Sequence, residues 1–230
     1  MTGITADFDG LIFDLSVPLS NATAHFPTDP AFRLTVHADF PTGGSLVSRI
    51  DTGLHIGTHV DAPLHVLPAG LSITGLPLRL FLGDAIAVDA PKGPGQDIGV
   101  SDLRDRDIRP NDIVLFRTGW EERSGSPRFF EGEWPGVSPA AADALIRIGV
   151  KAIGFDSPSA DSPRAAAGVI PAHKRLLGAG VPIFEALVNL TCVVGRRFFF
   201  IGLPLGIKQG EASPVRAVAL MGRFERESPG

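Results

Sequence analysis

The stretch His55-Ile-Gly-Thr-His-Val-Asp-Ala-Pro-Leu-His65 places three histidines and one carboxylate within eleven residues. The whole chain of 230 residues has six histidines, so half of them lie in this segment. Imidazole is a common metal ligand and carboxylate often accompanies it, so the segment predicts a metal site or a site of proton transfer. The alternative is that these are ordinary hydrogen-bonded core histidines.

The spacing of these residues constrains the local backbone. His55, His59 and Asp61 are all odd-numbered, so a straight strand would point them to one face. A strand rises about 3.3 Å per residue, which would separate His55 from His59 by roughly 13 Å. Two ligands of one ion cannot lie that far apart at their tips, so the segment cannot be a straight strand that binds one metal.

A helix is also disfavoured in this segment. Gly57 and Thr58 are poor helix formers, and Pro63 would end any helix just before it. We therefore predict a strand that bends at Gly57, where glycine supplies the backbone freedom that a tight turn needs. The first two histidines and the carboxylate then converge, and His65 lies just beyond them, across a corner at Ala62-Pro63.

The pattern His-x-Gly-Thr-His-x-Asp-x-Pro-x-His resembles the signature of the metal-dependent cyclase family of hydrolases, which includes bacterial kynurenine formamidases and isatin hydrolases. The resemblance extends over nearly the whole chain, from Asp14-Leu-Ser16 to Ser213-Pro-Val-Arg216. It implies the α/β fold of that family, a swivelling β/β/α cyclase-like fold with a mixed β-sheet and few helices. It also implies that residues 1–230 form a single cyclase-like metal-dependent hydrolase domain.

Two residues far down the chain extend the predicted site. Glu185 lies in an apolar segment, where an unpaired charge is costly unless a cation holds it or the position is an exposed strand end. His173 and Glu185 also match the downstream histidine and glutamate of the family. The resemblance implies that His55, His59 and Asp61 bind a first metal ion. It further implies that Asp61 can bridge to a second ion held by His173 and Glu185.

His65 resembles the catalytic histidine of the family. A divalent ion lowers the pKa of a bound water from about 15.7 toward 7, so hydroxide can attack an amide-type carbonyl at neutral pH. His65 would take the proton and pass it to the departing nitrogen. A role as a ligand, or as a support for one, stays open for His65. The nitrogen and oxygen ligand set suits zinc, as one or two ions, and also manganese.

The resemblance thus implies a hydrolase of an amide or formamide C–N bond in a small molecule, with the arylformamidase reaction of tryptophan catabolism as the leading case. One alternative is a ring hydrolase for isatin or a cyclic imide, which shares these residues. Another is a non-catalytic metal-binding relative, although the intact His65 argues against it. The family also indicates a homo-dimer or homo-tetramer.

The composition is that of a globular enzyme, with 44% hydrophobic and 20% charged residues. A formal net charge of −4 gives no reason to expect a nucleic-acid or anionic membrane partner. The single cysteine, Cys192, excludes an internal disulfide, and we expect its side chain to be buried. We see neither a basic leader nor a run of 18 apolar residues, so we expect a cytoplasmic protein.

Two supersecondary units frame the site segment. Phe32–Phe40 and Ser45–Leu54 predict a hairpin that delivers the chain to His55. Further on, Ser138 and Gly149 mark the start and end of a helix between strands at 112–117 and 151–155, which together predict a βαβ unit. Ser101 is expected to cap a short helical turn.

Polar residues directly after the second of these strands form the loop Asp156-Ser-Pro-Ser-Ala-Asp161. Ligands tend to bind at the carboxyl ends of strands in α/β folds. The family has a similar Asp-x-x-Ser-x-Asp loop, which implies that Asp156 and Ser159 help to hold the metal ligands in place. The alternative is an ordinary turn, for which these residue types are common.

The remaining histidines and a group of aromatic residues allow several interpretations. His25 and His37 are expected to be exposed or to lie at the rim of a pocket. Phe129, Phe130 and Trp134 could equally roof the pocket, fill the core or form a subunit contact.

Overall fold

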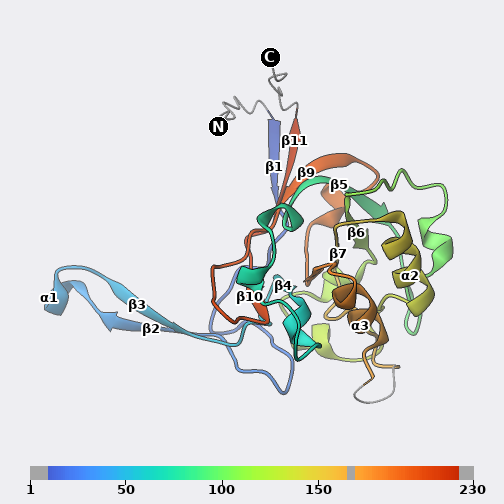
Figure 1. Ribbon diagram of the computed structural model, residues 1–230. Coiled ribbons are helices and arrows are strands. Elements are labelled where there is room, and N and C mark those ends of the chain that lie inside the picture. Colours follow the sequence, from blue (N-terminus) through green and yellow to red (C-terminus); the bar gives the residue numbers. More distant parts are fainter. Residues whose placement is uncertain (1–9, 165–168, 223–230) are drawn as a thin grey trace.

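The structure, a computed structural model, describes residues 10–164 and 169–222. Its main feature is a sheet built from nine strands. These are β1 (Gly10–Asp14), β4 (His59–Asp61), β5 (Leu82–Asp89), β6 (Ile113–Arg117), β7 (Ala152–Phe155), β8 (Ile183–Glu185), β9 (Arg197–Ile201), β10 (Ala212–Pro214) and β11 (Val218–Gly222). Their order in the sheet is β1-β11-β9-β5-β6-β7-β8-β4-β10 (Figure 1).

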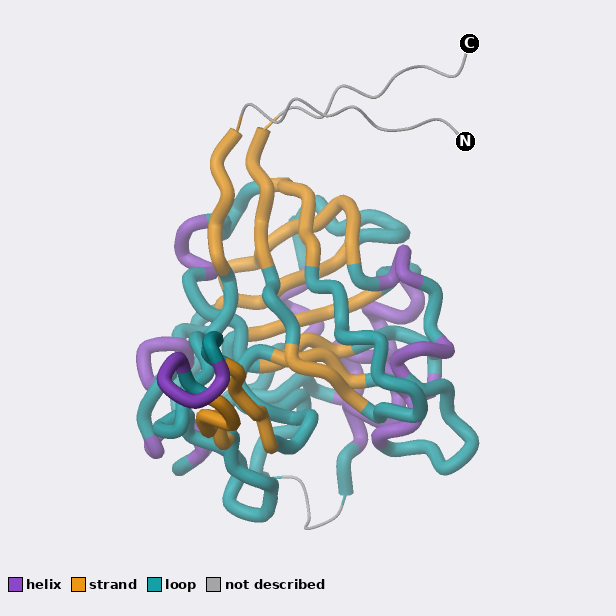
Figure 2. The backbone as a smooth tube through the Cα atoms, turned by 90° about the vertical axis from the view of Figure 1, so that its left-hand side faces the viewer, coloured by secondary structure: helices purple, strands orange, loops and turns teal. Residues whose placement is uncertain are grey.

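The sheet is mixed, because β5, β6, β7 and β8 run parallel and the other neighbours pair antiparallel. Figure 2 shows that the sheet curls, so that successive strands turn relative to one another below the paired N- and C-terminal strands. This curled half-barrel with few helices confirms the predicted fold class.

Two α-helices, α2 (Pro139–Ile148) and α3 (Pro171–Gly178), pack together against one face of the sheet (Figure 1). The predicted βαβ unit is confirmed as β6-α2-β7. Its helix begins at the Ser138 cap, whose Oγ accepts a hydrogen bond from the Ala141 N–H at 3.2 Å, and it ends at Gly149 with a φ of +84°. Apart from the single-turn helix α1 (Phe40–Gly43), the remaining helical segments of the described residues are short 3₁₀ turns at Pro63–His65, Ile73–Gly75, Leu78–Leu80, Val100–Leu103, Trp120–Arg123, Pro127–Phe130 and Leu190–Cys192.

The central strands are buried on both faces, which is why they read as continuous apolar runs rather than alternating ones. In β6, Ile113 and Leu115 pack into the core on one side of the sheet. Val114 and Phe116 point the other way, into the core beneath α2 and α3. The site therefore rests on strands that are fixed from both sides.

The predicted hairpin is confirmed, but it lies outside this sheet. β2 (Arg33–Ala38) and β3 (Val47–Asp51) form a separate two-stranded sheet whose tip holds the single-turn helix α1 (Phe40–Gly43). This hairpin projects from the body of the protein as an arm (Figure 1).

Two sequence predictions were wrong in detail. Gly99 rather than Ser101 precedes the 3₁₀ turn at 100–103, and its N–H donates to the Asp102 carboxylate at 2.7 Å. Cys192 is exposed rather than buried, since it ends the surface turn that follows β8. Within the described residues, no helix has the length and apolar content needed to cross a membrane.

Candidate metal centre

The predicted bend at Gly57 is present. Gly57 has a φ of +55°, a conformation that favours glycine, and a Cβ there would come within 2.6 Å of Leu19 Cδ2. The next residue fastens the bend, because the Thr58 hydroxyl donates to Ala186 O at 2.7 Å and accepts from Val17 N at 2.9 Å. The bend is thus tied both to the chain after β8 and to the N-terminal segment.

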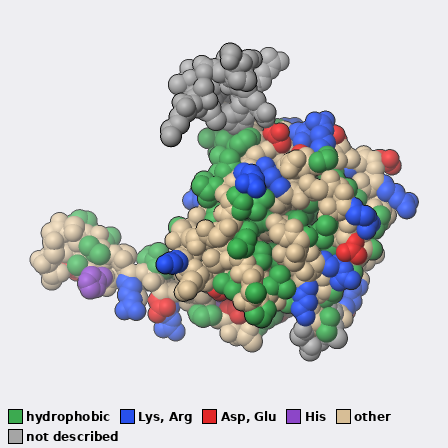
Figure 3. All heavy atoms as spheres, in the orientation of Figure 1, with side chains coloured by type: hydrophobic (Ala, Val, Ile, Leu, Met, Phe, Trp, Pro, Cys, Tyr) green, Lys and Arg blue, Asp and Glu red, His purple; other side chains and the backbone are tan. Residues whose placement is uncertain are grey.

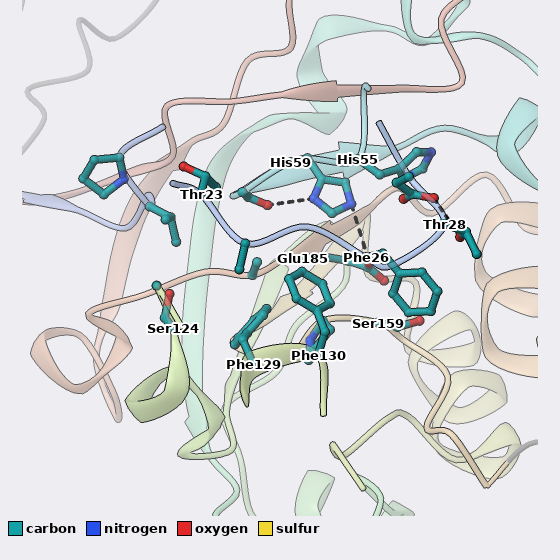
Figure 4. A pocket seen from close by; sticks show the side chains of 18 of the residues that line it. Thr23, Phe26, Thr28, His55, His59, Ser124, Phe129, Phe130, Ser159 and Glu185 are labelled. Atoms are coloured by element: carbon teal, nitrogen blue, oxygen red, sulfur yellow. Dashed lines mark hydrogen bonds and ion pairs between the residues drawn. The ribbon is translucent and has the colours of Figure 1, made fainter. Parts of the chain in front are cut away.

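Strand pairing then brings distant carboxylates and imidazoles together. β4 pairs with β8 so that His59 lies opposite Glu185, and His59 Nε2 is 3.5 Å from Glu185 Oε2 (Figure 4). On the same segment, Asp61 Oδ1 is 3.0 Å from His55 Nδ1 and 3.6 Å from His59 Nε2. From the first turn of α3, His173 Nε2 approaches Asp61 Oδ2 at 3.4 Å and Glu185 Oε1 at 3.3 Å. All five predicted metal ligands therefore meet in one place.

Two overlapping groups have ligand atoms that all lie within 4.8 Å of one another. One contains His59, Asp61 and Glu185, and the other contains His55, Asp61 and His65. Asp61 belongs to both groups, which fits a bridging carboxylate. The grouping differs from the one implied by the family resemblance, since His65 joins His55, and Glu185 joins His59.

Buried ligand atoms in this cluster contact one another without forming regular hydrogen bonds. Among the described residues, His59 Nε2 and both carboxylate oxygens of Asp61 are fully buried, and their polar neighbours are other ligand atoms of the cluster at 3.0–3.6 Å. Burying polar groups without well-formed hydrogen bonds is costly, and native proteins do so at few places. A divalent cation would satisfy these atoms, so the residues present fit a metal ion with nitrogen and oxygen ligands.

The charges of the cluster depend on one another. Burial alone would lower the pKa of His59, but the nearby carboxylates of Glu185 and Asp61 outweigh it and raise this pKa to about 9. Burial would raise the pKa of Asp61, yet His173 and His55 hold it well below its ordinary value. Without a cation, protons on the imidazoles therefore balance the carboxylates. A metal ion must displace those protons to bind.

His65 lies at the pocket side of the cluster and is its most exposed histidine. Its ring centroid is 4.2 Å from that of His55 and 5.5 Å from that of His173. Partial desolvation in the pocket lowers the pKa of His65, and the attraction of Asp61 does not offset this. Its imidazole is therefore neutral at pH 7 and able to accept a proton.

The residue that holds His173 in place is Asp161, which the sequence analysis did not single out. Asp161 accepts hydrogen bonds from His173 Nδ1 at 2.7 Å, His173 N at 3.1 Å and Ala172 N at 2.8 Å. An ionised carboxylate only accepts, so Nδ1 carries a proton and Nε2 is the nitrogen that faces Asp61 and Glu185. These carboxylates raise the pKa of His173 well above its ordinary value, so Nε2 must lose its own proton before its lone pair can bind an ion. In the sequence, the only indication of this role was that Asp161 ends an acidic loop twelve residues before His173.

Of the two residues predicted for this supporting role, Asp156 lies elsewhere, whereas Ser159 accepts a hydrogen bond from the Asp161 N–H at 3.3 Å through its Oγ. Asp156 is buried and accepts hydrogen bonds from the Thr118 N–H, the Thr118 hydroxyl and the Gly119 N–H. These bonds join the carboxyl end of β7 to that of β6. Ser159 lines the pocket. The backbone N–H of Ala160, in the same loop, donates to Glu185 Oε1 at 2.8 Å and orients that carboxylate.

A cavity of about 460 Å³ opens above the cluster and is lined by His55, His59, His65, His173 and Glu185. Figure 4 shows Phe26, Phe129 and Phe130 gathered across the cavity from His59 and Glu185. The size suits a small organic ligand with an apolar part.

The other aromatic residues and histidines take different places. Phe129 and Phe130 line the pocket, whereas Trp134 is buried and donates from Nε1 to the backbone oxygen of Asp161 at 3.0 Å. His25 lies beside the pocket segment, with Nδ1 2.9 Å from Phe26 O. His37 is exposed on the arm, so it is not at the pocket rim of its own chain.

A curled mixed sheet that joins imidazoles and carboxylates at the floor of an apolar pocket defines a class of metal-dependent hydrolases. The family model described as "Putative cyclase" matches residues 13–162. The chain therefore belongs to the cyclase family.

Relatives of known name agree with this. Kynurenine formamidase of Salinibacter ruber is 39% identical over 220 residues, covering 90% of this chain and 96% of the relative. Kynurenine formamidase of Sphingopyxis alaskensis is 34% identical over 90% of this chain and 96% of its own length. Among solved structures, isatin hydrolase A from Ralstonia solanacearum is similar, with a TM-score of 0.83, 25% identity and 91% coverage of both chains.

Proposed function

We propose that this protein is a metal-dependent hydrolase that cleaves the C–N bond of a small formamide, as a kynurenine formamidase does. The observation that carries the proposal is the set of buried ligand atoms of His59 and Asp61, which form no regular hydrogen bond and lie next to Glu185 at the floor of a pocket of about 460 Å³. The similarity to kynurenine formamidases over nine-tenths of the chain supports the same reaction class.

The metal ligands that we propose are His55, His59, Asp61, His173 and Glu185, with Asp61 shared between two positions. Zinc suits this set best, as one ion or two, and manganese is the alternative. When bound, the ion polarises a carbonyl and provides a water-derived nucleophile at neutral pH. The protein contributes to the reaction by holding these five side chains in one place and by lining the pocket with apolar walls.

His65 is the proposed general acid and base. Its neutral imidazole faces the cavity, so it can accept a proton from the water that adds to the carbonyl carbon and deliver that proton to the nitrogen as the C–N bond breaks. Phe26, Phe129 and Phe130 form the opposite wall, where an aromatic ring of the substrate can stack.

The test uses purified protein stripped of metal by a chelator. Formylated kynurenine and a simple aryl formamide should be hydrolysed after zinc or manganese is restored, and not before. The matched acetyl amide is the control for formyl selectivity. Hydrolysis that is indifferent to the metal would contradict the proposal.

A second candidate is a ring hydrolase of the isatin type. The likeness to isatin hydrolase A at a TM-score of 0.83 favours it. The same metal-restored protein, assayed for opening of the isatin ring, separates the two candidates by their relative turnover.

We also propose that residues 1–230 form a single domain that assembles as a homo-dimer or homo-tetramer in the cytoplasm. Pairing of β1 with β11 supports one domain, because it joins the two ends of the described chain in one sheet.

A further inference from the structure

The walls of the pocket carry one charged side chain besides the proposed metal ligands and His65. This residue is Asp29, and no lysine or arginine is among the described residues that line the pocket. On the face of the molecule seen in Figure 3, the Lys and Arg side chains are scattered over the body and the base of the arm. The pocket wall therefore offers a ligand a negative group that no positive side chain of the same lining balances.

A tight turn fixes the position of Asp29. Its N–H donates to Phe26 O at 2.9 Å, which closes a four-residue turn whose second residue is a proline of restricted φ. The next residue, Pro30, packs on Gly53, where a Cβ would come within 3.1 Å of Pro30 Cδ. Because Gly53 is two residues before His55, this contact brings Asp29 to the end of the pocket that His55 lines.

The carboxylate of Asp29 is free to bind a ligand. The side chain is half-buried, and its printed partner among the described residues is the Thr28 hydroxyl, which donates to Oδ1 at 3.2 Å. An ionised carboxylate has about four acceptor positions, so most of them remain open. Figure 4 shows Thr28 and His55 at one end of the pocket and Ser124 at the other, so this carboxylate lies near the proposed metal ligands.

The same turn also supplies part of the aromatic wall. Phe26 contacts the edge of Phe130 with ring centroids 6.0 Å apart, and that of Trp134 at 6.2 Å. One rigid turn therefore presents an aromatic ring and the Asp29 carboxylate to the same ligand. The ring favours an aryl group, and the carboxylate favours a cation that the ligand carries on a side arm.

We propose that Asp29 binds a protonated amine of the substrate, so that the pocket selects aryl formamides whose side arm ends in an ammonium group and lacks a carboxylate. The formamide part of this class rests on the proposed function, whereas the preference for a cation rests on Asp29. An ammonium donates charge-assisted hydrogen bonds to a carboxylate. A carboxylate on the same arm would meet Asp29 as a like charge and would find no cation in the described lining.

The test measures binding by calorimetry on the metal-loaded protein, with aryl ketones that contain no formyl group. Kynuramine, whose arm ends in an ammonium, should bind about tenfold more tightly than ortho-aminopropiophenone, which has the same ring and ketone without the amine. The analogue ortho-aminobenzoylpropionate, whose arm ends in a carboxylate, should bind more weakly than the neutral ketone. Kynurenine, which carries both charges, should bind no more tightly than kynuramine.

Three variants assign the preference to the charge of Asp29. Asp29→Asn keeps an oxygen that can accept from Thr28, and it should bring the affinities for kynuramine and the neutral ketone within threefold of each other. Thr28→Val is the matched control, because it removes the hydrogen bond to Asp29 and keeps the charge, so the preference should persist. Asp29→Lys should bind the carboxylate analogue about tenfold more tightly than the wild type does, a gain that a damaged fold cannot produce.

The outcome is separable from the proposed function, because none of these ligands contains the amide bond to be cleaved. A preference for kynuramine in a protein that hydrolyses no formamide would support the role of Asp29 and contradict the proposed hydrolase. Equal affinities for kynuramine and the neutral ketone in the wild type would overturn the inference. A preference that survives Asp29→Asn, or one that Thr28→Val removes as completely as Asp29→Asn does, would also overturn it.

Discussion

Replacing Asp161 by asparagine tests how much of the metal site depends on one buried carboxylate that is not itself a proposed ligand. The substitution keeps the size of the side chain but turns one acceptor oxygen into an NH₂ donor. Because Asp161 takes bonds from Ala172 N, His173 N and His173 Nδ1, the asparagine cannot serve all three donors. Its NH₂ group must face either the Ala172 N–H or the two N–H groups of His173, so that one donor points at another.

The expected size of the effect follows from these contacts. A hydrogen bond to a charged group contributes about 1.5–3 kcal/mol. Losing the carboxylate that orients a metal-binding histidine typically lowers metal affinity by 10–100-fold, which is about 1.4–2.7 kcal/mol. The two estimates agree, so Asp161→Asn should weaken zinc binding by 10–100-fold. It should also lower the free energy of unfolding of the metal-free protein, since at least one of the two N–H groups at the start of α3 loses its acceptor.

The assay is competition with a chromogenic chelator on stripped protein at pH 7, together with urea unfolding. Asp156→Asn is the matched control, because Asp156 is also buried and lies in the same loop but accepts hydrogen bonds from Thr118 and Gly119. It should lower stability and leave zinc affinity within threefold of the wild type. If Asp161→Asn binds zinc as tightly as Asp156→Asn does, the positioning role of Asp161 is wrong.

Three further predictions concern the same cluster. His65→Ala should keep its metal content and lose turnover by 10²–10⁴-fold, and a parallel loss of metal by elemental analysis would make His65 a ligand instead. Gly57→Ala should lose about 1–3 kcal/mol of stability and weaken metal binding, because it strains the bend and meets Leu19, whereas Gly195→Ala, with a φ of +71° and open space, should only lose stability. In the metal-free protein, the pKa of His59 is raised to about 9, so its protonated form stabilises the fold fully below pH 6.5. That contribution, up to about 3 kcal/mol, should fade as the pH rises through 9, and melting temperatures of the zinc-loaded protein should not show this decline.

Local chemistry made much of this site predictable from the sequence. Gly57 between two potential ligands indicated a bend, since neither a straight strand nor a helix could bring His55 and His59 onto one ion. The cap at Ser138 and the glycine at 149 likewise marked both ends of α2, because these residue types act through contacts within a few positions.

Local sequence patterns could not predict the pairing of β4 with β8 or the orientation of the Asp161 carboxylate. β4 has three residues, too few to show an alternation, and its register against Glu185 depends on packing of distant segments. Asp156 and Asp161 occupy one short acidic loop, and residue type alone does not tell which carboxylate turns toward His173. That orientation depends on the start of α3 and on Trp134, which fixes the backbone at Asp161.

The fold and the site are connected through the protons of the cluster. β4, β8 and α3 press imidazoles and carboxylates together in a buried space, where the carboxylates keep the pKa of His59 and of His173 above the ordinary histidine value. These protons let the metal-free protein fold, since they neutralise carboxylates that would otherwise repel each other. The same protons compete with a cation, so metal uptake should strengthen as the pH rises, over the range in which the metal-free fold weakens. The strands that bring the ligands together therefore also determine the pH at which the ion replaces the protons.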